Sequence, residues 1–362
     1  MTKKYPVFDG HNDTLLRLFE KEDGQTQSFF QGGEKGHIDL PRARAGGFAG
    51  GFFAVFVPNP REEQDAEVDD FPGTKSSAKG GGFAYEMSMP APLDFGYATR
   101  TVMGMVRLLY AIEADSQGEV TIVRAAEELE RAIDDGVLAA VLHFEGAEAI
   151  DTDLNALHVY YAAGLRSLGI VWSRHNAFGY GVPFKYPAGP DIGPGLTDAG
   201  KRLVTECNTL GIMVDLSHLN EAGFWDVAAR TSAPLVATHS NAHALCASPR
   251  NLTDKQLDAV AESNGVVGLN YHVGFLRADG RSDQETSLSE IVRHAVYMAD
   301  RIGVDHLALG SDFDGAKMPA DLKDAAGLPR LTAALLDAGF SDDDLMKITH
   351  QNWIRVLRQT WR

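Results

Sequence analysis

The sequence predicts a single (β/α)₈ barrel, and three observations favour this fold. Eight short apolar runs with the composition of strands are spread along the 362 residues. Helical patterns lie between most of these runs, which predicts parallel pairing of the strands. The runs VLAAVLHF, GIMVDL and GVVGLNY are continuously apolar, as expected of a parallel sheet that is covered on both faces.

Each element follows from a local pattern. The expected strands are rich in β-branched and apolar residues and span residues 5–10, 51–57, 138–144, 165–172, 211–217, 234–238, 265–271 and 306–311. The expected helices show helical spacing of apolar residues and span residues 97–115, 122–135, 198–210, 221–230, 254–263 and 286–302. Ser341 and Asp344 predict a capped helix near the end of the chain. An open doubly wound sheet is the competing fold, because a strand count does not show closure.

Two segments interrupt this alternation. Residues 58–92 contain a charged run and a Gly-rich stretch, and we interpret them as one long loop insertion between a strand and a helix. Residues 173–196 are rich in Gly and Pro and form a second long loop. Loops of this kind lie over the catalytic face of a barrel, so the first is expected to act as a lid or as a mobile insertion. We expect one catalytic domain over residues 1–362.

Charge and composition exclude several classes of partner. The chain has 33 Lys and Arg against 50 Asp and Glu, a net charge of −17, which argues against nucleic acid and anionic membranes as partners. No apolar run approaches the roughly 20 residues of a membrane span. Two cysteines are too few for a disulfide framework. The start, MTKKYPVFDGHND, lacks the apolar run of a signal peptide, so a cytoplasmic location is expected.

Residues with the chemistry of metal ligands follow several of the expected strands. In a barrel these strand ends meet at one face. His11 and Asp13 are two residues apart, so their side chains leave the same side of an extended backbone. Glu145 carries two oxygens and can bridge two cations. His218 and His239 supply neutral nitrogen donors of the type that zinc accepts.

Two further residues are candidates for the reaction itself. Asp312 ends the last strand, where its carboxylate is a ligand or the acid/base. Arg250 follows the loop at 240–249, and its guanidinium suits a substrate carboxylate, with a surface arginine as the alternative. The sequence contains no phosphate-binding glycine motif, no G-x-S-x-G motif and no H-E-x-x-H motif.

Seven segments, in their order and spacing, resemble the membrane dipeptidase (renal dipeptidase) family, peptidase family M19 of the amidohydrolase superfamily. They are DGHND, HIDLPR, HFEG, VDLSH, THS, CASPRN and GSDFDG, and they begin at residues 9, 37, 143, 214, 238, 246 and 310. The resemblance covers nearly the whole chain. The signal peptide, the lipid anchor and the extra cysteines of the animal members are not found in this sequence. The resemblance therefore predicts a soluble, bacterial-type member of the family.

The resemblance implies a binuclear zinc site. It assigns His11 and Asp13 to one ion and His218 and His239 to the other. The implied cofactor is two Zn²⁺ per chain, bridged by Glu145 and a hydroxide. The implied activity is zinc-dependent hydrolysis of dipeptides, including L-Xaa-D-Xaa, by an enzyme that is a possible homodimer.

The resemblance also implies roles in catalysis. It makes Asp312 the acid/base and Arg250 the residue that holds the free carboxylate of the substrate. Family members carry a substrate-polarising histidine after the fourth strand, whereas this chain has WSRHN, with Ser173 at that place. Arg174 and His175 are the expected substitutes.

Two alternatives remain open at this point. The first is an amidohydrolase that acts on an N-acyl amino acid, a lactone or a β-lactam, for which Arg250 would matter only when the substrate has a free carboxylate. The second is a non-catalytic metal-binding scaffold that has kept the fold. A scaffold is expected to lose a ligand or Asp312, and all of these residues are present.

Overall fold

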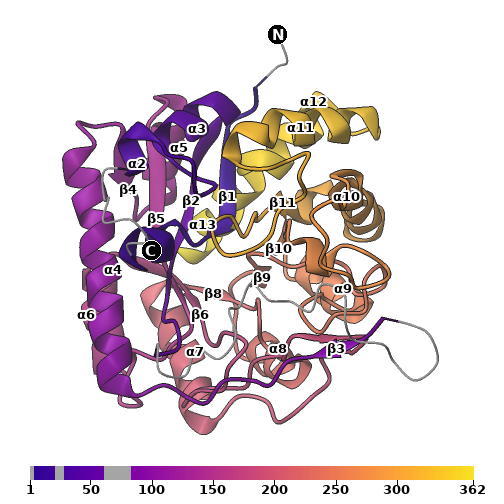
Figure 1. Ribbon diagram of the computed structural model, residues 1–362. Helices are drawn as coiled ribbons and strands as arrows, with labels where there is room; N and C mark the ends of the chain where they lie inside the picture. Colours follow the sequence, from indigo (N-terminus) through magenta and orange to yellow (C-terminus); the bar gives the residue numbers. More distant parts are fainter. Residues whose placement is uncertain (1–3, 21–27, 61–82) are drawn as a thin grey trace.

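The computed structural model describes residues 4–20, 28–60 and 83–362. Eight parallel strands form a nearly closed barrel in the order β1 (Val7–Asn12), β2 (Phe48–Phe56), β5 (Leu138–Glu145), β6 (Leu165–Gly169), β8 (Met213–Asp215), β9 (Val236–Ala237), β10 (Val266–Leu269) and β11 (Leu307–Leu309). Helices surround this ring of strands (Figure 1). The predicted barrel is confirmed, and the open sheet is excluded.

Closure of the barrel depends on the segment that follows β11. Asn12 and Phe313 form an isolated parallel bridge. The amide of Asp312 donates to the carbonyl oxygen of His11 at 3.0 Å, and the amide of Asp13 donates to the carbonyl of Phe313 at 2.8 Å. These bonds join the last strand to the first, and they place Asp312 beside His11 and Asp13.

The helices follow the predicted alternation. The α-helices are α1 (Thr14–Glu20), α2 (Ser28–Gln31), α3 (Leu40–Gly46), α4 (Phe95–Asp115), α5 (Ala126–Asp134), α6 (Asn155–Ala162), α7 (Asp198–Leu210), α8 (Glu221–Ala228), α9 (Asp254–Glu262), α10 (Ser289–Ile302), α11 (Leu328–Asp337), α12 (Asp342–Met346) and α13 (Asn352–Thr360). Short 3₁₀ turns lie at Val273–Phe275, Val304–His306 and Ala325–Gly327, and Lys347–Gln351 is a π-helix. The capping box of Ser341 and Asp344 begins α12 as predicted.

One expected helix was wrong at its start. Residues 120–122 form the strand β4 (Val120–Ile122), which pairs in parallel with the first residues of β5, and α5 begins only at Ala126. The VTIV sequence is β-branched, and a neighbouring strand edge is available to it, so pairing overrides the helical pattern there.

Apolar residues fill both sides of the strands. Inside the barrel, Phe8, Phe52 and Val141 belong to a cluster that Trp353 of α13 completes, with the Phe52 and Trp353 ring centroids 5.3 Å apart. A larger cluster lies between the strands and the surrounding helices. Within the described ranges, no helix is long and apolar enough to cross a membrane.

Close approach of three strands narrows the barrel near the site. A Cβ atom on Gly268 or Gly310 would lie 2.0 or 1.9 Å from the carbonyl oxygen of Thr238, so neither position has room for a side chain. The absence of side chains lets β9, β10 and β11 converge. As a result, the residues that follow these strands lie close together.

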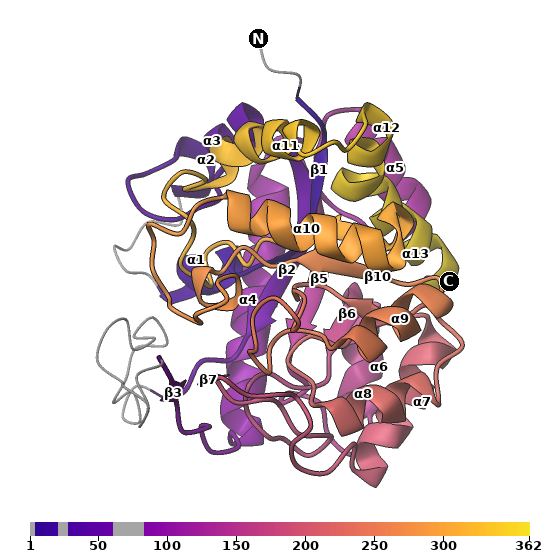
Figure 2. The same ribbon diagram turned by 90° about the vertical axis from the view of Figure 1, so that its right-hand side faces the viewer.

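A small second sheet connects the two long loops. β3 (Tyr85–Glu86) pairs antiparallel with β7 (Lys185–Tyr186), and Figure 2 shows the two strands side by side, away from α11 and α12. The aromatic rings of Trp172 and Phe184 lie 5.9 and 6.4 Å from the ring of His218. The described parts of both loops therefore border the carboxyl face, although residues 61–82 of the predicted 58–92 insertion lie outside the described residues.

Candidate active site

Glu145 lies at the centre of the polar cluster. Its Oε1 is 2.9 Å from His218 Nε2 and 3.7 Å from His239 Nε2. Its Oε2 is 3.6 Å from His11 Nε2. The two carboxylate oxygens therefore face different imidazoles, which is the arrangement that a bridging carboxylate needs.

The first strand contributes the second half of the cluster. His11 Nε2 lies 3.3 Å from Asp13 Oδ2, so the predicted shared side of the backbone is confirmed. His11, Asp13 and Asp312 form one group of close donor atoms, and His11, Glu145 and His239 form another. His11 belongs to both groups, so the two potential cation positions adjoin.

The donor set fits a metal centre on three observations. Both nitrogens of His11 are buried without a hydrogen-bond partner in the described part of the chain. Such burial is unfavourable unless another group, such as a metal ion, binds a ring nitrogen. Ligand atoms of a tetrahedral zinc site lie about 3.3 Å apart, given Zn–N and Zn–O distances near 2.0–2.1 Å. His218 Nε2 and His239 Nε2 are 3.2 Å apart, close to that spacing. Imidazole and carboxylate together are donors that zinc accepts.

Electrostatics favour a cation in the same place. Burial raises the pKa of Glu145 and of Asp13, because their charged forms lose water. Burial also lowers the pKa of His218 and His239, which favours the neutral, ligating form. Burial acts to lower the pKa of His11 as well, but the Glu145 and Asp13 carboxylates raise it to about 10. The carboxylates thus favour positive charge at the centre of the cluster.

Hydrogen bonds fix the orientation of the two candidate ligands His239 and His218. Thr238 Oγ1 lies 2.6 Å from Asp215 Oδ2 and 2.8 Å from His239 Nδ1. A carboxylate only accepts hydrogen bonds, so the hydroxyl donates to Asp215 and accepts from Nδ1–H. This tautomer leaves the Nε2 lone pair of His239 directed at the cluster. Ser173 Oγ lies 2.9 Å from His218 Nδ1 and occupies the equivalent position there.

Two of the site residues have left-handed backbones. His218 has φ 65° and Asp312 has φ 62°. This backbone conformation is unfavourable for residues other than glycine and costs of order 1 kcal/mol or more. Strain of this kind persists where the surrounding structure holds it, and here it turns both side chains at the ends of their strands.

Arg250 lies beside this centre. It is 3% exposed, its Nη2 donates to the carbonyl oxygen of His239 at 3.3 Å, and its Nε is buried without a partner among the described residues. Burial lowers the pKa of Arg250, while Asp312 and Glu145 act to raise it. A buried guanidinium with an unused donor is suited to bind an anionic group.

Comparison with known proteins identifies the family. The sequence profile of the family described as membrane dipeptidase (peptidase family M19) matches residues 1–362. The chain belongs to this family. It is therefore a metallo-dipeptidase of the hydrolase class, as the resemblance implied.

Three relatives illustrate the similarity. A metallopeptidase from Rhodobacter sphaeroides, solved with a phosphinate mimic of the dipeptide L-Ala-D-Ala, is 46% identical, with a TM-score of 0.93 over 99% of this chain and 100% of that chain. An uncharacterized protein in the pqqA 5′ region of Klebsiella pneumoniae is 49% identical over 255 residues, 70% of this chain and 94% of that protein. Dipeptidase tcpJ of Claviceps purpurea is 29% identical over 97% of this chain and 76% of that protein.

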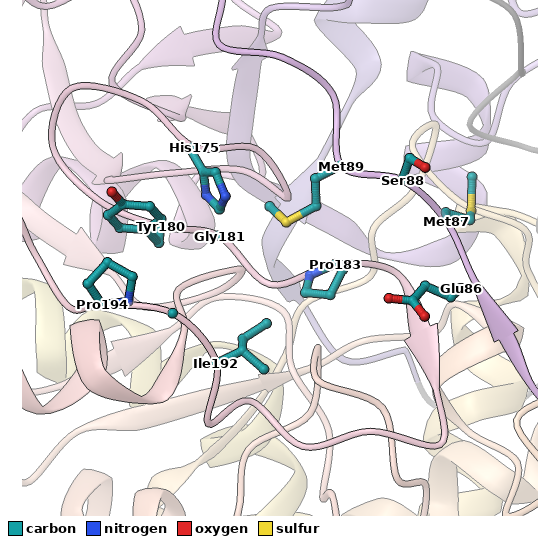
Figure 3. A pocket seen from close by; sticks show the side chains of 11 residues that line it. Glu86, Met87, Ser88, Met89, His175, Tyr180, Gly181, Pro183, Ile192 and Pro194 are labelled. Atoms are coloured by element: carbon teal, nitrogen blue, oxygen red, sulfur yellow. The ribbon is translucent and has the colours of Figure 1, made fainter.

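The two substitutes proposed for the missing family histidine lie in different surroundings. In this M19 chain, all three guanidinium nitrogens of Arg174 donate to protein atoms, and the side chain is fully buried. These contacts argue against direct binding of substrate by Arg174. His175 lies 4.5 Å from Tyr180, ring centroid to centroid, and lines a cavity of about 440 Å³ between residues 86–89 and the 173–196 loop (Figure 3). Its role in substrate binding stays a prediction.

Sequence reasoning missed one residue that contacts the predicted acid/base. Asn270 Nδ2 donates to Asp312 Oδ2 at 2.8 Å. The Asn270 backbone is held in turn by both groups of the Asn241 side chain, at 2.9 and 3.2 Å. Asn270 directly follows β10 and is the last residue but one of the strand expected at 265–271, so a search for polar residues near strand ends could also have identified it.

Proposed function

We propose that this M19 dipeptidase binds two zinc ions per chain and hydrolyses dipeptides with a free terminal carboxylate, including L-Xaa-D-Xaa. The observation that carries the proposal is the placement of Glu145, whose two oxygens face different imidazoles. The dipeptide mimic on the Rhodobacter sphaeroides relative supports the substrate class. The cytoplasmic location and a homodimer remain predictions from the sequence.

The proposed ligands divide into two sets. His11 and Asp13 would hold one ion, His218 and His239 the other, and Glu145 both; the distances around Glu145 support this division. When bound, a zinc pair lowers the pKa of water and polarises the carbonyl of the substrate.

Asp312 is proposed to move the proton. Water adds to the scissile carbonyl carbon, Asp312 accepts a proton from that water, and the same proton passes to the departing nitrogen as the C–N bond breaks. The carboxylic acid product gives the second proton of the water to the amine, so the final products are a carboxylate and an ammonium group. The hydrogen bond from Asn270 orients the carboxylate of Asp312, which leaves Oδ1 available for this transfer.

Arg250 is proposed to bind the terminal carboxylate of the substrate. Its Nε has no partner within the part of the chain that the structure describes, and the side chain is buried. Both observations support this role, because a buried charge is stabilised when a partner of opposite charge arrives. A buried carboxylate–guanidinium pair also selects against substrates that lack the carboxylate.

Hydrolysis of L-Ala-D-Ala and L-Ala-L-Ala by zinc-loaded protein tests the proposed function. We expect release of free alanine from at least the first, abolished by a chelator and restored by zinc. N-acetylated and C-amidated dipeptides are the controls, and the amidated one should be a poor substrate. Hydrolysis of an N-acyl amino acid in preference to every dipeptide would overturn the proposal.

A further inference from the structure

A buried pair of opposite charges lies next to the metal-binding cluster and takes no part in it. Arg174 Nε and Nη2 both lie 3.4 Å from Glu148 Oε1. The two side chains are 0% and 2% exposed. Charges so deeply buried are costly, and removing one partner of such a pair leaves the other charge without compensation.

The pair connects the ends of three neighbouring strands. Arg174 follows β6, and Glu148 follows β5. Arg174 also donates from Nη2 to the carbonyl oxygen of Val57 and from Nη1 to Asn59 Oδ1, both at 2.8 Å. Val57 and Asn59 directly follow β2 and begin the connection to α4. One guanidinium therefore holds the start of that connection against the end of β5.

The carboxylate of Glu148 packs on the backbone that follows Glu145. Gly146 has φ 103°, and a Cβ atom there would lie 2.1 Å from Glu148 Oε2. No other residue type would leave room for Glu148 at this place. The position of Glu148 thus limits the backbone conformations that are available to the residue after Glu145.

Arg174 is linked to the opposite side of the cluster as well. Its guanidinium carbon lies 5.4 Å from the ring of Trp172, and this ring lies 5.9 Å from the ring of His218. The adjacent Ser173 is hydrogen-bonded to His218 Nδ1. A shift of Arg174 would therefore reach both Glu145 and His218.

We propose that Arg174 and Glu148 are positioning residues, which together hold the ends of β2, β5 and β6 in the arrangement that aligns Glu145 and His218 for metal binding. Arg174 then acts through protein contacts and does not touch substrate. This inference rests on the proposed metal site, and it replaces the substrate-binding role that the sequence suggested for Arg174.

The test distinguishes two roles of Arg174, namely a structural role through its pair with Glu148 and a direct contact with the substrate. Arg174→Met and Glu148→Met each leave one buried charge unpaired, and we expect each to weaken zinc binding at least 10-fold in a competitive chelator titration. The double variant Arg174→Met/Glu148→Met replaces the pair by apolar groups, and we expect its zinc affinity to return to within about 3-fold of wild type, since apolar replacements of buried pairs are often tolerated.

Local hydrogen exchange provides a readout that general destabilisation would not reproduce. The amides of Gly146 and Ala147 donate to the carbonyl oxygens of Gly169 and Ile170. We expect these amides to exchange faster in Arg174→Met, with the amides of β10 unchanged, and to be protected again in the double variant. Arg174→Lys keeps the charge and serves as the milder variant if Arg174→Met does not fold.

The matched control is the exposed pair of Arg44 and Glu119, with side chains 44% and 54% exposed, where Arg44→Met should not change zinc affinity. Unchanged zinc affinity in Arg174→Met with a raised KM, not rescued in the double variant, would overturn the inference in favour of substrate contact. Wild-type protein that binds no zinc would refute the proposed function instead.

Discussion

Replacing Thr238 by Val removes a single oxygen from the support of His239. That oxygen lies between Asp215 Oδ2 at 2.6 Å and His239 Nδ1 at 2.8 Å. Valine keeps the shape of the side chain, so the main change is the loss of these two hydrogen bonds and of a longer one, at 3.4 Å, with Ser217 Oγ. The imidazole then lacks the acceptor that fixes its tautomer and its ring orientation.

The expected loss follows from the contacts. Removing a partner that orients a ligating histidine typically weakens metal binding by about 10- to 100-fold, which corresponds to about 1.4–2.7 kcal/mol. The hydrogen bond to the Asp215 carboxylate is charge-assisted and contributes about 1.5–3 kcal/mol to folding. The free energy of unfolding of the metal-free protein should therefore fall by a similar amount.

Competition with a chromogenic chelator measures the zinc affinity, and urea unfolding of metal-free protein measures the stability. Thr238→Ser is the control, because it keeps the hydroxyl and loses only a methyl group. We expect the serine variant to bind zinc within a few-fold of wild type. If Thr238→Val bound zinc as tightly as the serine variant, the hydroxyl would not orient His239 and the reasoning would fail.

Three further predictions concern catalysis, substrate and pH. Asp312→Asn should keep its zinc in elemental analysis and lose about 10²- to 10⁴-fold in kcat, whereas near wild-type kcat would exclude the acid/base role. Arg250→Met should raise KM for L-Ala-D-Ala much more than for its C-terminal amide, and an equal rise for both would argue against carboxylate binding. Burial lowers the pKa of His294 to about 4, so its contribution to stability is present above about pH 6.5 and is lost as the pH falls through 4. This contribution to the free energy of unfolding is about 3 kcal/mol. In His294→Asn the free energy of unfolding should therefore depend less on pH over that range, and an unchanged pH profile would contradict this prediction.

The polar ends of the strands could be predicted from the sequence. His11, Glu145, His218 and His239 each follow an apolar run, and the ends of parallel strands must meet at one face, so strand order alone brings them together. The barrel fold and the position of the cluster required no further information.

Other features depend on contacts between distant segments. β4 forms because the edge of β5 is available, and β3 pairs with β7 although each strand has only two residues. These strands are too short to show the alternation of apolar and polar residues by which a strand is recognised in a sequence. The left-handed backbones of His218 and Asp312 were likewise not predicted, although Asp and His adopt this conformation more often than most residues other than glycine.

The role of Arg174 shows the same limit. Its sequence position, two residues before Asn176, suggested a substrate contact, because the sequence does not reveal that Glu148, Asn59 and Val57 already engage the guanidinium. Arg250, which follows the loop at 240–249, was also a candidate for substrate binding, and its Nε has no partner among the described residues. The difference between the two arginines lies only in their packing.

The metal content of wild-type protein and of Glu145→Gln tests the central claim most directly. The amide keeps the size of the side chain but loses the charge and one of the two acceptor oxygens that face His11 and His218. Elemental analysis after chelation and reloading should give about two zinc ions per chain in the wild type and about one or fewer in the variant, with loss of dipeptide hydrolysis. Active wild-type protein without metal, or a variant that keeps both ions and full activity, would contradict the account.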